Sequence, residues 1–140
     1  MPTRALILAA LLVFAPAGCM SSIYVGRYRD GISQNQQSLQ QLALGMTGGE
    51  VTALLGEGEI VQYRKILLVD PWRSEGFALA DGTPVRILYY LTQPPQKYYA
   101  PDEADLTPIV LENDTLVGWG WSYLRRNTDR YQVESPQLQE

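Results

Sequence analysis

The sequence predicts an α+β fold in which two short N-terminal helices pack on an antiparallel meander of three or four strands. Apolar residues recur at helical spacing between residues 38 and 56, whereas residues 59–124 are rich in β-branched and aromatic residues divided by turn signals. The helices precede the strands, so the two kinds of element form separate layers, and we expect the helices to cover one face of the sheet.

The first predicted helix lies in SLQQLALGM, residues 38–46. Its apolar residues recur at i, i+3, i+4 and i+7, which is the stripe of an amphipathic helix, and Gly45 is placed to end it as a C-cap. The stripe consists of Leu39, Leu42, Ala43 and Met46.

The second predicted helix lies in MTGGEVTALLG, residues 46–56. Thr47 and Glu50 stand three residues apart, which is the spacing of a capping box at a helix N-terminus. Gly56 follows the last apolar residue and marks the stop. The predicted buried face consists of Val51, Leu54 and Leu55.

Three segments with strand patterns follow: EIVQYRKILLV, VRILYYL and TPIVLENDTLVGWGWSYL. Turns are predicted at Ala80-Asp81-Gly82 and at Asn113-Asp114, and the second is a good centre for a tight hairpin. The domain is therefore expected to span residues 34–126. In VRILYYL one predicted face consists of Val85, Ile87, Tyr89 and Leu91.

The last predicted strand carries two tryptophans. In a continuous strand, alternate residues share a face, so one face is bulky and the other is nearly bare. Either the bulky face fills the core beneath the helices, or the bare face lets a helix approach closely while the tryptophans line a partner surface. The bulky face consists of Val117, Trp119, Trp121 and Tyr123, and the bare face of Leu116, Gly118, Gly120, Ser122 and Leu124.

The N-terminus has the layout of a secretory signal, because Arg4 precedes an apolar run and small residues follow it. The run is shorter than the roughly 20 apolar residues that span a bilayer. Ala17-Gly18-Cys19 resembles the end of a bacterial lipobox, although Pro16 stands where an aliphatic residue is usual. A plain signal peptide with a chance cysteine is the alternative.

The lipobox resemblance predicts that residues 1–18 are removed, that Cys19 carries the lipid anchor, and that residues 19–33 form a tether. Cys19 is the only cysteine, so the fold has no internal disulfide. By resemblance to enterobacterial lipoproteins, Met20 in place of aspartate favours the outer membrane over the cell membrane, with the domain facing the periplasm.

The absence of histidine from the sequence removes most zinc sites and Ser-His-Asp triads, and we predict no catalytic residue, metal site or cofactor. The net charge of -4 gives no basic footprint for nucleic acid. Asp102, Glu103 and Asp105 cluster in a Pro-rich stretch, which reads as a solvated acidic loop or at most a weak cation site, because it lacks the glycine and closing glutamate of a calcium loop.

Two stretches resemble a known family. LALGMTGGEVTALLG is similar to the Gly-Met-Thr, Val and Leu-Gly pattern of the SmpA/OmlA (BamE-like) lipoproteins, and VLENDTLVGWGW resembles their closing hairpin. The family usually has proline after Leu-Gly, where this chain has Glu57-Gly58, and the DPWRSEGF and VGWGW details favour a relative of BamE rather than BamE itself. The resemblance implies the α+β fold and a periplasmic, membrane-anchored setting.

These observations predict a non-enzymatic lipoprotein that binds an envelope protein in cell-envelope maintenance or outer-membrane assembly. Trp72 and Arg73, in a predicted loop, are the first candidate contacts, and Trp119 and Trp121 the second, since binding hot spots are enriched in Trp and Arg. Trp72 has an equally good alternative as a lid over the core. Residues 127–140 are polar and are expected to be a disordered tail.

Two alternatives to partner binding remain open. The helices and sheet also resemble β-lactamase-inhibitor proteins, which suggests a ligand-binding or inhibitory module. A hydrolase that uses carboxylates needs two of them facing each other across a cleft, and the sequence offers no obvious pair.

Overall fold

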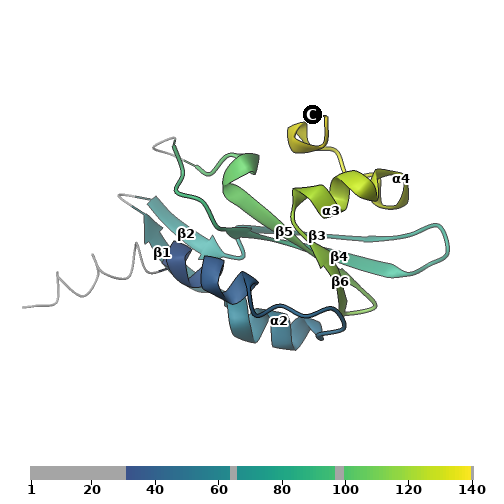
Figure 1. Cartoon of the computed structure of the whole chain (residues 1–140), viewed down its shortest axis with the longest axis horizontal. Helices are drawn as coiled ribbons and strands as arrows, with labels where there is room; N and C mark the ends of the chain where they lie inside the picture. The colour runs from purple at the N-terminus through teal and green to yellow at the C-terminus, as the bar shows by residue number, and fades with distance from the viewer. Residues whose placement is uncertain (1–30, 64–65, 97–99, 140) are drawn as a thin grey trace, which may run out of the picture.

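The computed structural model describes residues 31–63, 66–96 and 100–139, and its fold is α+β (Figure 1). The predicted signal peptide, Cys19 and most of the predicted tether lie outside the described residues. In chain order the elements are a helix over residues 31–39, α2 (Gly48–Leu55), β1 (Glu59–Tyr63), β2 (Ile66–Asp70), β3 (Arg73–Ala78), β4 (Pro84–Leu91), the 3-10 helix η1 (Glu103–Asp105), β5 (Leu106–Glu112), β6 (Thr115–Trp119), α3 (Trp121–Arg126), α4 (Thr128–Tyr131) and the 3-10 helix η2 (Pro136–Leu138).

The central sheet is an antiparallel meander in the order β3-β4-β5-β6, which confirms the predicted meander, although β1 and β2, from the first predicted strand segment, lie outside it. Both predicted turns are present. Asn113 and Asp114 have φ values of 48° and 58°, which suit a two-residue hairpin between β5 and β6. Strands β1 and β2 pair only with each other and form a separate two-stranded sheet.

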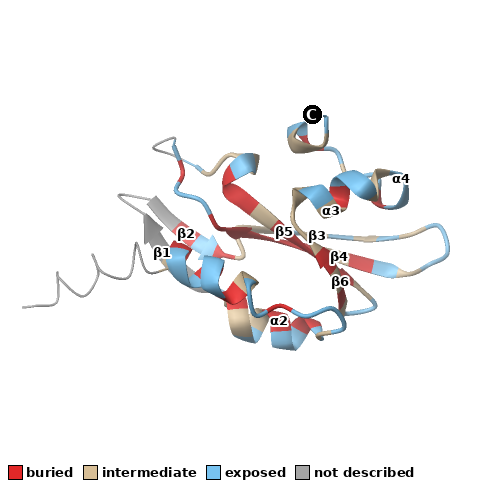
Figure 2. Cartoon of the chain, in the orientation of Figure 1, coloured by how far each residue is buried: buried red, intermediate tan, exposed pale blue. Residues whose placement is uncertain are grey.

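The central sheet is buried on both faces, whereas the sequence predicted helices on one face only. Alternate residues of β4 point to opposite sides: Ile87 and Tyr89 enter a core with α3 and α4, and Leu88 and Tyr90 enter a core with α2. Figure 1 shows α2 on one side of the sheet and α3 and α4 on the other, and burial is concentrated on the strands between them (Figure 2). The C-terminal helices therefore supply a layer that sequence analysis missed.

The predicted capping box of α2 is confirmed. The backbone N–H of Thr47 donates to Glu50 Oε2 at 2.8 Å, and the backbone N–H of Glu50 donates to Thr47 Oγ1 at 3.2 Å. The bond from the Thr47 backbone N–H, together with one from the Thr47 hydroxyl to Glu50 Oε2 at 3.0 Å, lowers the pKa of the Glu50 carboxyl below its usual value. Val51 and Leu55 are buried in the core beneath, as their spacing predicts.

The first helix is displaced from its predicted position. It ends at residue 39, and residues 31–33, assigned above to the tether, are helical. The chain after it pairs with the free edge of β6, since the Gly45 N–H donates to the Leu116 carbonyl at 2.9 Å and the Leu116 N–H donates to the Met46 carbonyl at 2.7 Å. Gly45 has a positive φ of 90°, as predicted for a C-cap glycine, but it lies in the segment that pairs with β6 and not at a helix end. Pairing with the sheet therefore outweighs the helical pattern at residues 42–46.

The last predicted strand is interrupted twice, so its predicted faces are wrong. The β5–β6 register slips between Val110 and Leu111, which makes Val117 an extra residue and reverses the alternation beyond it. Gly120, with a φ of 84°, then ends the extended chain, and α3 begins at Trp121. Trp119 and Trp121 consequently lie in different cores on opposite faces of the sheet.

Residues 127–139 are ordered, contrary to the predicted disordered tail. Tyr131 is buried, and its hydroxyl donates to Glu112 Oε1 at 2.7 Å. Arg130 pairs with the same carboxylate through Nε at 2.7 Å, and these contacts lower the pKa of the Glu112 carboxyl, the Arg130 hydrogen bond most of all. Because apolar residues such as Val133 and Leu138 pack against the sheet's core, this segment gains enough burial to stay in place.

Candidate functional site

Three of the four predicted contact residues gather around one buried tyrosine of β4, Tyr89. The Arg73 guanidinium carbon lies 3.9 Å from the centre of the Tyr89 ring, and the Trp121 ring centre lies 5.8 Å from it. The backbone N–H of Trp72 donates to the Tyr89 carbonyl at 2.8 Å. We call this group, with its two carboxylates, the Tyr89 cluster: Trp72, Arg73, Glu75, Tyr89, Glu103 and Trp121.

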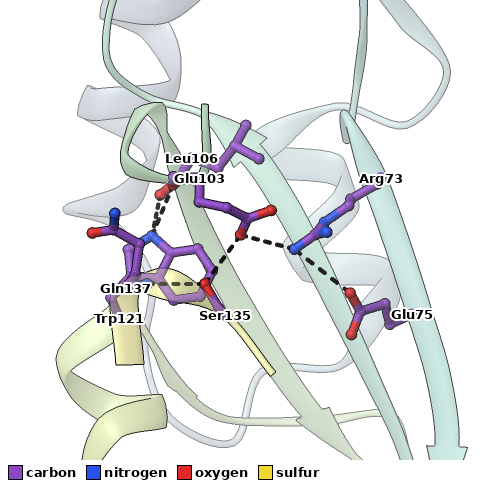
Figure 3. Close-up of polar contacts among 7 residues, drawn as sticks. All are labelled: Arg73, Glu75, Glu103, Leu106, Trp121, Ser135 and Gln137. Carbon is purple, nitrogen blue, oxygen red and sulfur yellow. Dashed lines mark hydrogen bonds and ion pairs between the residues drawn. The ribbon is translucent and has the colours of Figure 1, made fainter. Parts of the chain in front are cut away.

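Arg73 is the charged centre of the Tyr89 cluster. Its Nη2 atom lies 3.0 Å from Glu103 Oε2 and 3.5 Å from Glu75 Oε1 (Figure 3). The two ion pairs hold the Arg73 side chain in one geometry. The side chain is 36% exposed, so one side of it still faces solvent. The sequence placed Arg73 and Glu75 in a loop, but both belong to the edge strand β3, where they alternate with exposed residues.

Trp72 and Trp121 are bound into the core and are not free surface aromatics. Trp72 is half-buried and packs against the core on this face of the sheet, as the lid interpretation expects. The indole N–H of Trp121 points inward and donates to the Leu106 carbonyl at 2.8 Å and the Glu103 carbonyl at 3.1 Å (Figure 3). Trp121 therefore fastens η1 and the start of β5 to α3.

Trp119 does not belong to the Tyr89 cluster. It packs against the core on the α2 side of the sheet, together with Ile109 and Leu116. The structure thus separates the two tryptophans that the sequence assigned to a single surface.

The acidic stretch is part of the fold rather than a solvated loop. Asp105 is buried and accepts a hydrogen bond from the Asp102 backbone N–H at 2.8 Å, and Glu103 is engaged with Arg73. Among the described residues, no three acidic, cysteine or histidine side chains are grouped to hold a metal ion.

Glu75 and Glu103 are the two carboxylates of the Tyr89 cluster. Both contact the same nitrogen of Arg73, which lies between them. This arrangement is an ion-pair triad, whereas glycoside hydrolysis needs two carboxyl groups that face each other across an open cleft. The geometry is better suited to presenting a fixed, stacked arginine than to moving a proton.

Tyr89 is the site residue that sequence analysis did not single out. The alternation in VRILYYL places it on a core face, but only the β3–β4 register sets it directly opposite Arg73. Burial is the main reason that the pKa of the Tyr89 hydroxyl is raised, and the neighbouring Glu75 carboxylate adds to the effect. The ring therefore stays neutral at physiological pH and serves as a platform for the guanidinium.

A concave region lies between the first helix and α2, away from the Tyr89 cluster. It is an open groove of about 580 Å³ lined by Ser33, Gln34, Gln37, Ser38, Gln41, Ala53 and Leu54. The glutamines are exposed, and the hydroxyl of Ser38 is already bonded to the Leu54 carbonyl at 2.9 Å. Nothing in this groove matches a predicted contact residue, so the Tyr89 cluster is the stronger candidate.

A protein-family model with the description "Protein of unknown function (DUF3192)" matches residues 25–126, which is most of the chain. The chain belongs to the DUF3192 family. The match includes every residue of the Tyr89 cluster and ends with α3, so α4 and the segment after it lie outside the matched region. Comparisons with curated proteins and with solved structures find no match. No helix among the described residues of this DUF3192 protein is long and apolar enough to span a bilayer.

Proposed function

We propose that the chain is a lipid-anchored lipoprotein of the outer membrane that faces the periplasm and binds an envelope protein partner through the Tyr89 cluster, without catalysing a reaction. The observation that carries this proposal is the position of Arg73: it stacks on Tyr89, pairs with Glu103 and Glu75, and still reaches solvent from an edge strand. Arginine is enriched among binding hot spots, particularly where it is fixed before the partner arrives.

The proposed relationship with the SmpA/OmlA lipoproteins rests on the sequence motifs. The two motif stretches lie together, because the Gly48 N–H donates to the Asp114 carbonyl at 2.9 Å and Thr47 bridges to Thr115. Their residues mainly build the fold around α2 and the closing hairpin, and of the Tyr89 cluster they include only Trp121. The motifs therefore suggest a setting in the envelope, while the cluster suggests where a partner binds.

We expect Arg73→Ala to abolish recovery of the partner when the chain is affinity-purified from detergent-solubilised membranes. A hot-spot arginine contributes about 2 kcal/mol or more, which is roughly a thirtyfold loss of affinity. The matched control is Arg126→Ala, since Arg126 is an exposed arginine of α3 and is not a member of the ion-pair triad. If both variants recover every partner at wild-type levels while remaining folded, the Tyr89 cluster is not the binding surface.

We expect Cys19→Ala to release the protein from the membrane fraction. At about 0.8 kcal/mol per buried methylene group, more than one acyl chain holds a protein on a membrane, and no other anchor is predicted. Cell fractionation followed by immunoblotting checks this, with the neighbouring Ser22→Ala as the control. A Cys19→Ala protein that sediments with membranes as completely as the control contradicts lipid anchoring.

A further inference from the structure

The Tyr89 cluster is partly covered by the end of the chain. We call residues 132–139 the C-terminal strap. Within it, η2 lies against α3 and η1, and Val133 and Leu138 pack against the core that contains Tyr89. Ser135 is buried, with its hydroxyl 3.5 Å from Glu103 Oε2, so Glu103 stands between Arg73 and the strap (Figure 3).

The strap is attached to the domain by few polar contacts. The DUF3192 match ends at residue 126, and Gln132, with a φ of 52°, turns the chain away from α4. Among the described residues, the strap's backbone–backbone hydrogen bonds after Gln132 are internal to it. Its side-chain bonds to the rest of the domain are the long contact to Glu103 and a 2.8 Å bond from the exposed Arg125 to the Gln137 carbonyl.

We propose that the strap is an intramolecular occupant of the partner-binding surface, and that the partner presents there a short peptide segment of the strap's own chemistry. This inference rests on the proposed function of the Tyr89 cluster. The strap is the polypeptide that the structure shows seated on this surface, and it shows what fits: two apolar side chains against the core and a hydroxyl donor at Glu103. A partner segment that binds here displaces the strap.

The charges next to the strap indicate which side chains the partner segment can place there. Around Glu103 the ion-pair triad has one guanidinium, from Arg73, and two carboxylates, from Glu75 and Glu103, which leaves an excess of one negative charge within the triad, while Arg125 contacts the strap farther along, at Gln137. A hydroxyl, amide or ammonium donor next to Glu103 is therefore favoured, and an acidic side chain at that position is disfavoured. The buried residue that the strap places there, Ser135, follows this rule.

The test uses the full-length chain in detergent and a fluorescein-labelled synthetic peptide of residues 131–139 as the probe. Leu138→Asp places a charge where the strap meets the core and should open it, while Gln139→Asp adds the same charge at an exposed neighbour. We expect Leu138→Asp to bind the peptide at least tenfold more tightly than the wild type or Gln139→Asp, by fluorescence anisotropy. Thermal unfolding of all three proteins should stay cooperative with similar midpoints.

Two outcomes overturn the inference. If Leu138→Asp unfolds with the wild-type midpoint but binds the peptide no better, the strap does not occupy a usable surface. If Leu138→Asp loses cooperative unfolding, the strap is an inseparable part of the core. The titration needs no cellular partner, so its failure is distinct from that of the proposed function, which is judged by partner recovery with Arg73→Ala.

Discussion

Replacing Trp121 by alanine is expected to lower the free energy of unfolding by about 3 to 5 kcal/mol, the cost typical of removing a large aromatic side chain from a core. Trp121 packs against Tyr89, and its indole N–H bonds two carbonyls, those of Leu106 and Glu103. Alanine leaves a cavity beside Tyr89 and deprives both carbonyls of their donor. The effect is therefore expected on stability first, and on partner binding only as a consequence.

Urea denaturation of the wild type, Trp121→Ala and Trp121→Phe measures this. Phenylalanine keeps most of the ring but lacks the N–H, so it should lose only the hydrogen-bond contribution, about 1 kcal/mol for each bond. A wild-type midpoint for Trp121→Ala combined with loss of the partner would restore the original interpretation of Trp121 as a surface anchor.

Features that depend on a few neighbouring residues could be predicted from the sequence. The capping box needs only Thr47 and Glu50, and the tight hairpin needs only Asn113 and Asp114, whose side chains tolerate a positive φ. The alternation of β4 was also correct, because burial on a sheet face repeats every second residue.

Features that depend on distant partners could not be predicted. Residues 42–46 have a helical pattern, yet Gly45 and Met46 form hydrogen bonds with Leu116 at the edge of β6. That edge is about 70 residues away in the sequence, so a pattern within residues 42–46 cannot predict the pairing. The β-bulge at Val117 reverses the faces of the strand residues that follow it, Gly118 and Trp119, and the pattern of hydrophobic residues gives no sign of it. The sequence predicted disorder for the C-terminal segment because it has few apolar residues. Those residues stabilise the segment only through their contacts with the core of the sheet, which the sequence does not show.

The candidate site also combines features that the sequence could predict with features that depend on distant residues. Composition selected Trp72, Arg73 and Trp121, because few other residue types make strong contacts in a chain without histidine. Their convergence on Tyr89 depends on the β3–β4 register and on α3 starting where a strand was expected. Sequence alone therefore named side chains that belong together but assigned Trp121 to the wrong element.

Gly118→Ala is expected to destabilise the domain by about 1 to 3 kcal/mol, although alanine is a better strand residue than glycine. Gly118 lies in β6 opposite Val110, and a Cβ atom there would overlap the ring of Tyr123 from α3. The ring cannot easily move away, because its hydroxyl bonds that of Tyr131 at 3.0 Å, and Tyr131 is tied to Glu112. The added methyl group must therefore push α3 and α4 away from the sheet.

A double-mutant cycle isolates this steric effect. Tyr123→Ala removes the ring, so adding Gly118→Ala to that variant should cost little, and the coupling between the two changes should account for most of the single-variant loss. Gly48→Ala is the matched control: the nearest atoms to its Cβ would be the ends of the Asp114 and Arg86 side chains, an exposed ion pair that can swing aside. If Gly118→Ala costs no more than Gly48→Ala, or costs the same with and without the Tyr123 ring, close packing of α3 on Gly118 is not what holds the C-terminal layer on the sheet.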